Sequence, residues 1–167
     1  FIQGWAPNGS TYRIPGLYQS ATNNEATADD FGTYGNATNK ISLAMGQLLT
    51  DKILPPYNLT LHPTQWSELL GSESSTGTKE WENIMRMLNP YGGTAGQIRM
   101  STALTTATGM LSGIGIKYFD YIEAQAPKFQ LTLDPKLGAL SPVFGTQYEG
   151  IVPRITQTDA ICTLTNI

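Results

Sequence analysis

The stretch Leu59-Thr-Leu-His-Pro-Thr-Gln-Trp-Ser-Glu-Leu-Leu70 changes from a strand pattern to a helix pattern at a single His-Pro step. The residues before His62 favour a strand. Pro63 fits the first turn of a helix, where its missing N–H is not needed. Apolar residues then recur at helical spacing, namely Trp66, Leu69 and Leu70. His62 is the single histidine of the chain, so any His-based catalytic site would have to lie at this corner.

Charged residues are scarce in the 167-residue chain, which is long enough for one domain, or for one domain and a small lobe. Asp, Glu, Lys and Arg make up 14% of it, against about 25% in typical soluble domains. Thr, Asn, Ser, Gln and Gly take their place. This composition fits a secreted or extremophile protein with an uncharged polar surface. It fits equally a subunit that buries much of its surface against copies of itself.

The charge balance and the apolar pattern argue against several classes of partner. The net charge is −3 and no basic run occurs, which disfavours nucleic-acid binding through neutralised phosphates. No apolar run is long enough to span a bilayer, and neither a lipidation motif nor a secretory signal is visible. The chain begins at Phe1 and not at Met, which predicts a cleaved or artificial boundary.

The clearest helix is predicted over residues 38–52. Thr38 or Asn39 is expected to cap its start, and Pro55-Pro56 prevents its continuation. Its apolar face consists of residues at helical spacing, namely Ile41, Ala44, Met45, Leu48 and Leu49.

The rest of the chain alternates short elements with loops, and together they predict an α+β fold. Further elements are expected, in chain order, as a strand at 57–61, a helix at 63–70, a helix capped by Thr78 and ending before Asn89-Pro90, strands at 98–100, 117–124 and 129–133, and a strand-rich end over 150–167. The region 102–116 has helical spacing but contains three glycines, so it is ambiguous. Residues 1–35 read as an ordered loop region, with a turn at 14–17 and an exposed polar stretch at 23–27. Pro153 is expected at an edge strand or at the end of a strand.

Histidine and cysteine chemistry finds little support in the sequence. The sequence contains no Gly-x-Ser-x-Gly nucleophile elbow for which His62 could act as the base. Because Pro63 also constrains the backbone of His62, we favour a capping or packing role. With one cysteine, an internal disulfide is excluded. Cys162 lies in a strand-like run and is expected to be a small buried hydrophobe. One His, one Cys and no spaced acidic cluster predict no metal site.

Three pairs of carboxylates are the remaining catalytic candidates. They are Asp29 with Asp30, Glu80 with Glu82, and Asp120 with Glu123. A spacing of two places the Glu80 and Glu82 side chains on different faces of a helix. A spacing of three separates Asp120 and Glu123 on a strand. We therefore interpret all three pairs as solvated surface charge.

The aromatic residues are predicted to be mostly structural. Trp66 and Trp81 lie on apolar helix faces and are expected in the core. Trp5, in a loop, is expected to anchor that loop or to face a neighbouring subunit. Tyr91 lies in the Gly-rich loop 89–96, where it either contacts a partner or covers a turn. That loop lacks the Gly-Lys-Ser/Thr ending of a phosphate-binding loop.

The order of these elements resembles a known family. A Gly- and Pro-rich segment containing Gly16-Leu17 leads to one amphipathic helix, then to the corner at 59–70, then to a helix, glycine loops and a Tyr-rich strand. The chain closes with Val152-Pro-Arg-Ile155 and the run Ala160-Ile-Cys-Thr-Leu164. This resembles the C-terminal two thirds of a major capsid protein of the tailed-virus coat fold, which encapsulin shell proteins share.

The resemblance implies a tailed-phage capsid fold in three segments. Residues 1–56 would be a peripheral-domain segment with the end of the spine helix, residues 57–130 the axial domain, and residues 131–167 returning peripheral-domain strands. It also implies a structural subunit without enzyme activity, catalytic residues, metal or cofactor. The glycine loops at 71–77 and 89–96 would line the centres of capsomers.

The same resemblance implies self-assembly into hexamers and pentamers of an icosahedral shell that encloses a viral genome. The subunit would lie in a virion assembled in the host cytoplasm, with other virion proteins as further candidate partners and with neither sequence-specific nucleic acid nor a membrane. An encapsulin nanocompartment is the close alternative. Alternatives of another class are a secreted glycosidase that uses Asp120 and Glu123, and a sugar-binding module that uses Trp5 and Tyr91.

Overall fold

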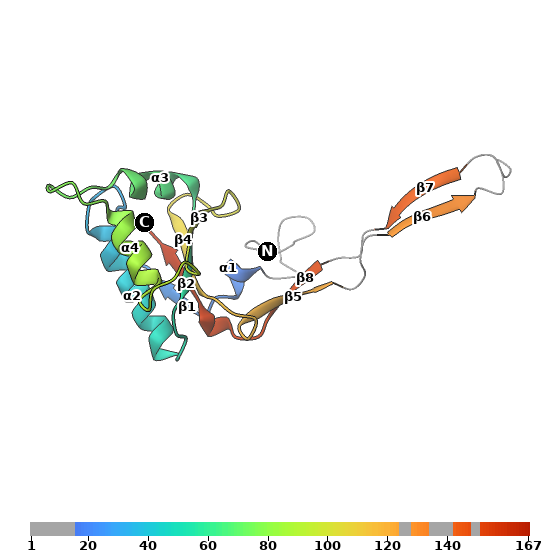
Figure 1. The fold of residues 1–167 in the computed structure, drawn as a ribbon, viewed down its shortest axis with the longest axis horizontal. Coiled ribbons are helices and arrows are strands. Elements are labelled where there is room, and N and C mark those ends of the chain that lie inside the picture. Colours follow the sequence, from blue (N-terminus) through green and yellow to red (C-terminus); the bar gives the residue numbers. More distant parts are fainter. Residues whose placement is uncertain (1–15, 124–127, 134–141, 148–150) are drawn as a thin grey trace.

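The computed structural model describes residues 16–123, 128–133, 142–147 and 151–167. A five-stranded sheet forms its body, with the longer helices gathered on one side of that sheet (Figure 1). The elements, in chain order, are α1 (Leu17–Ser20), β1 (Asn23–Glu25), α2 (Asn36–Thr50), β2 (Tyr57–Leu61), α3 (Pro63–Gly71), α4 (Glu80–Leu88), β3 (Ile98–Met100), β4 (Thr108–Gly113), β5 (Phe119–Glu123), β6 (Lys128–Leu133), β7 (Pro142–Gln147), β8 (Ile151–Ile155), a 3-10 helix (Thr158–Ala160) and β9 (Ile161–Thr165).

The sheet has the order β1-β9-β4-β2-β3 and is antiparallel at its centre. Strand β4 pairs antiparallel with both β2 and β9, whereas the short outer strands β3 and β1 pair parallel with β2 and β9. The register places Leu59, Leu111 and Cys162 in one row across three strands. These side chains are fully buried, so register and burial together define one apolar face of the sheet.

Helix α2 covers this apolar face. The predicted helix at 38–52 is confirmed, although α2 begins two residues earlier and ends two residues earlier, at Thr50. Its buried residues follow helical spacing, and they are Ala37, Lys40, Ile41, Ala44 and Leu48. They join the strand residues of the sheet, together with Ile84 and Leu88 of α4, in one core.

The loop predicted over residues 1–35 is partly wrong. Leu17, which was expected to end a turn at 14–17, instead begins the short helix α1 (Leu17–Ser20). Asn23–Glu25 forms β1 at the edge of the sheet. Glu25 is buried and not exposed. The reason is tertiary, because three polar residues carry no strand periodicity of their own and are held by pairing with β9. Trp5 lies outside the described residues.

The ambiguous region 102–116 contains the strand β4, although its apolar residues are at helical spacing. Gly109 faces Leu61 and Ile167 so closely that a Cβ there would lie 2.7 Å from Leu61 Cδ2 and 3.1 Å from Ile167 Cδ1. Gly109, one of the glycines that weakened the helix prediction, is therefore required by strand packing. Strands at 57–61, 98–100 and 129–133 are found close to the predicted ranges.

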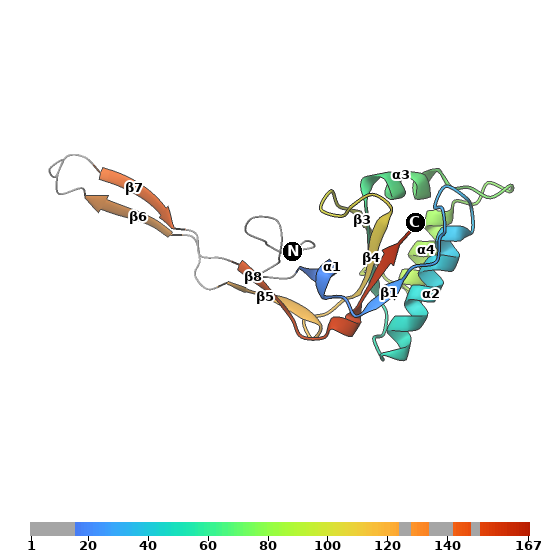
Figure 2. The ribbon, with the colours of Figure 1, turned by 180° about the vertical axis from the view of Figure 1, so that it is seen from behind.

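The end of the chain forms two ribbons and the strand β9. Strands β5 and β8 pair with each other, as do β6 and β7, and Figure 2 shows the β6–β7 ribbon extending away from the helices. Pro153 lies opposite Tyr121 in the two-stranded β5–β8 ribbon, where every strand is an edge. Strand β9 returns to the five-stranded sheet, where it lies between β1 and β4. The division at 56 and 130 stays a prediction.

Candidate functional site

His62 is a helix cap. It is the N-cap residue of α3, and its Nδ1 accepts a hydrogen bond from the Thr64 backbone N–H at 3.3 Å. Pro63 follows at the first helical position, as the sequence predicts. The backbone carbonyl of His62 accepts from the Trp66 N–H, so both polar groups begin the helix. The capping role of His62 is confirmed.

Glu80 is a buried carboxylate that joins three helices, so its interpretation as solvated charge is wrong. One oxygen accepts from the Thr38 N–H at 2.7 Å and from the Thr38 hydroxyl at 2.9 Å. The other accepts from the Ser72 hydroxyl at 2.7 Å. Glu80 is fully buried, whereas Glu82 is exposed. The two carboxylates therefore do not act as a pair.

Glu80 performs the capping that was expected from Thr38 or Asn39. The N-cap of α2 is Gly35, which has no side chain to offer and a φ of 98°. Thr38 donates its own backbone N–H to Glu80 across 42 residues of sequence. The negative charge also lies at the positive end of α2, which is favourable. The expected cap of α4 by Thr78 is likewise wrong, because its N-cap is Lys79 without a side-chain cap.

The other acidic candidates are separate groups. Asp30 accepts from the Gly32 N–H at 2.8 Å and from the Thr33 hydroxyl at 3.2 Å, which closes a turn. One oxygen of Asp29 is buried and has no hydrogen-bond partner among the described residues. Asp120 and Glu123 lie on β5, opposite Arg154 and Ile151 of β8. The structure describes no side-chain geometry for Asp120 and Glu123, so their roles stay predictions.

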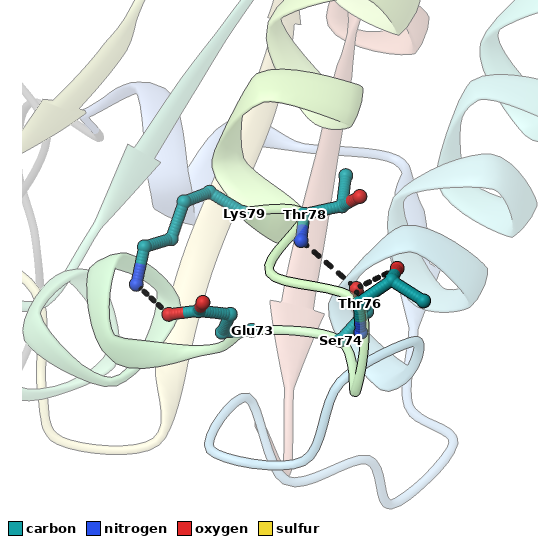
Figure 3. Close-up of polar contacts among 5 residues, drawn as sticks. All are labelled: Glu73, Ser74, Thr76, Thr78 and Lys79. Carbon is teal, nitrogen blue, oxygen red and sulfur yellow. Dashed lines mark hydrogen bonds and ion pairs between the residues drawn. The ribbon is translucent and has the colours of Figure 1, made fainter.

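The loop between α3 and α4 is a small clamped hairpin at one end of the molecule. Glu73 and Lys79 form an antiparallel bridge and an ion pair at its base. Inside it the Ser74 hydroxyl accepts from the Thr78 N–H at 2.9 Å and lies 3.0 Å from the Thr76 hydroxyl (Figure 3). The backbone N–H of Ser74 donates to the Thr78 carbonyl at 2.9 Å. These bonds give a polar, exposed tip a defined shape.

The loop between α4 and β3 is closed by one side chain. The Asn89 amide donates to the Met85 carbonyl at 3.1 Å and to the Gly96 carbonyl at 3.0 Å. Its oxygen accepts from the Gly96 N–H at 2.7 Å. Tyr91 is 81% exposed in this loop, which rules out the alternative that it covers a turn. The other alternative, that Tyr91 contacts a partner, stays a prediction.

Trp66 and Trp81 line the same apolar groove but are not equally buried. Trp66 packs partly buried against the core, as predicted, whereas Trp81 is 36% exposed, which makes its core prediction wrong. The groove lies between α3, α4 and β3, and its lining consists of Trp66, Leu69, Leu70, Trp81, Met85 and Ile98.

Helix α2 contains a buried lysine, Lys40, which the sequence interpretation missed. Lys40 is fully buried, and its ammonium donates to the carbonyls of Thr27 and Thr165. Burial lowers the pKa of Lys40, and the charges of Glu25 and Asp29 oppose that shift. Lys40 lies three residues after Ala37 and four before Ala44, so helical spacing alone places it on the inner face of α2.

Cys162 is buried as predicted. Its thiol lies 3.5 Å from the Gln47 amide oxygen. Burial, followed by the nearby charge of Glu25, raises the pKa of the Cys162 thiol to about 12. A protonated, inaccessible thiol is a poor nucleophile. No group of three or more His, Cys, Asp or Glu suited to a metal ion occurs among the described residues. In the same part of the chain, every helix is too short or too polar to cross a bilayer.

The chain is similar to a family of encapsulating proteins and to the subunits of a virus-like particle and a phage capsid. A family model, Linocin_M18, described as an encapsulating protein for peroxidase, matches residues 8–107, which is more than half of the chain. A virus-like particle from Pyrococcus furiosus is similar over 87% of this chain, with 17% identity and a TM-score of 0.60. The capsid of the Myoviridae phage XM1 is similar over 98%, with 11% identity and a TM-score of 0.72.

The two solved structures are longer than this chain, which covers 57% of each of them. No curated protein matches it. The likeness to both structures confirms the predicted α+β capsid fold of tailed viruses and encapsulins.

Proposed function

The chain belongs to the family of encapsulating proteins for peroxidase, and from this we propose that it is a structural subunit that self-associates into a closed icosahedral shell. The family match over residues 8–107 carries the proposal. The fold supports it, because both similar structures are particles built from such subunits. As a coat, the subunit would carry out no chemistry of its own.

Assembly would proceed through heterologous contacts, in which two different surfaces of neighbouring copies meet. Such contacts generate a ring when the rotation between neighbours closes on itself. Two ordered, exposed loops suit such contacts. The clamped hairpin at 72–79 and the Asn89-closed loop at 89–96 are candidates for the centres of hexamers and pentamers. Gly77, Gly92 and Gly93 have positive φ values in these loops, which glycine adopts without strain.

The enclosed content separates two forms of this proposal. The family description favours a compartment filled with an enzyme. The fold likeness to a phage capsid, over 98% of the chain, favours a virion with a genome and further virion proteins. Particles purified from cells, treated with nuclease and then opened, would release protected nucleic acid in a virion and a co-purified protein in a compartment.

Assembly itself is tested by light scattering coupled to gel filtration, followed by negative-stain electron microscopy of the void fraction. We expect rings or closed particles of uniform diameter, in a proportion that rises with protein concentration. The proposal predicts that assembly survives moderate salt, because the exposed loops are mostly uncharged. A chain that stays strictly monomeric at every concentration would overturn it.

A further inference from the structure

The outward face of α2 lacks the charge that a solvated helix face carries. Six residues of α2 are exposed, and all six are uncharged: Asn39, Ser42, Leu43, Gly46, Leu49 and Thr50. Leu43 is 45% exposed and Leu49 is 47% exposed. The one charged residue of α2, Lys40, is buried on the opposite side. Surface helices usually place charged residues outward, so this face resembles a surface that is covered.

Helix α4 provides the contrast within the same molecule. It also packs one face on the core, through Ile84 and Leu88. Its exposed residues include Glu82 and Arg86, which are four positions apart and of opposite sign, a favourable spacing on a solvated helix. The lack of charge on the outer face of α2 is therefore a property of that helix and not of every helix in the chain.

Gly46 lies in the middle of the uncharged face, and nothing in the described part of the chain packs over it. Beyond the backbone of its own helix, no heavy atom of the described chain lies within 4 Å of the position that a Cβ would occupy. Glycine destabilises a helix interior relative to alanine. Because Gly46 has no side chain, another chain can approach the helix backbone closely between Leu43 and Leu49.

We propose that this outer face of α2, centred on Gly46, is buried against a second copy of the chain. The inference rests on the proposed shell function. A heterologous contact needs a second, different surface on the same chain. The Asn89-closed loop at 89–96 is also uncharged and presents the exposed Tyr91. Contact between two uncharged surfaces removes no charge from water. A second copy therefore offers a matching surface.

The test uses cysteine labelling, because the native Cys162 is buried. Two cysteine variants are treated with a maleimide before and after assembly. The test variant is Leu43→Cys on α2, and the control is Ser67→Cys on α3. Both residues are exposed in one copy. We expect Leu43→Cys to react about tenfold more slowly in assembled particles than in unassembled protein, while Ser67→Cys reacts at a similar rate in both.

A second pair of variants tests the close approach. Gly46→Gln is expected to fold normally, by circular dichroism and urea unfolding, and to lose most of its assembly. The control Ser67→Gln should assemble like the unmodified chain. Labelling of Leu43→Cys at the unassembled rate within particles, or normal assembly of Gly46→Gln, would overturn this contact alone. An unmodified chain that never assembles would overturn the shell function together with it.

Discussion

Both faces of α2 contain leucine, yet the described part of one copy covers only the inner face. Leu48 is fully buried against the sheet and Leu49, its neighbour in sequence, is 47% exposed. The comparison teaches that the inner face determines the stability of one copy, whereas the outer face is free to determine association between copies.

The largest expected effect comes from shortening the inner leucine. Leu48→Ala should lower the free energy of unfolding by about 3 kcal/mol, because it removes buried methyl groups and leaves a cavity. Leu49→Ala should change it by about 0.5 kcal/mol or less, as exposed positions do. Urea unfolding of the two variants measures the difference. Equal losses would mean that the two faces are not distinct within one copy.

The next effect concerns the end of α2 that Glu80 holds. Glu80→Ala should cost about 2 kcal/mol, because the helix loses its cap and the Ser72 hydroxyl loses its buried partner. The matched control is Glu82→Ala, two residues away and exposed, which should be close to neutral. A neutral Glu80→Ala would show that Gly35 and water satisfy the helix start without the carboxylate.

The sequence predicts the local parts of this arrangement and misses the distant ones. The His62-Pro63 corner and the apolar stripe of α2 follow from neighbouring residues, so their physics is visible in one short window. Glu80 acts on Thr38 across 42 residues, and Asn23 donates to the Asp159 carbonyl across 136 residues. Neither the helical nor the strand periodicity of a sequence indicates pairs of residues that are so far apart. Lys40 could have been predicted, because it occupies a position of the inner stripe.

A smaller effect is a pH dependence that arises on the inner side of α2. Burial raises the pKa of Cys162 from 9.0 to about 12, so the folded state keeps a proton that the unfolded state releases. The stability contributed by the protonated thiol is fully present below pH 9.0 and is lost as pH rises towards about 12.

The measurement compares urea unfolding of the unmodified chain with that of Cys162→Ala at a series of alkaline pH values. The unmodified chain should lose about 1.4 kcal/mol more per pH unit above the ordinary thiol pKa. Burial also raises the pKa of Tyr57 to about 12, but Tyr57 is present in both proteins and cancels in the difference. Parallel pH profiles would contradict the burial of the thiol.

The smallest effect has the opposite sign and comes from the outer face. Gly46→Ala should raise the free energy of unfolding of one copy by about 0.5–1 kcal/mol, because alanine favours the helix and the space beside Gly46 is open. Gly109→Ala on β4 should destabilise, since its Cβ would lie 2.7 Å from Leu61 Cδ2. A Gly46→Ala chain that is less stable than the unmodified chain would show that Gly46 serves the fold. A more stable chain that assembles less well would show that a glycine unfavourable to the helix is kept at this position for the contact.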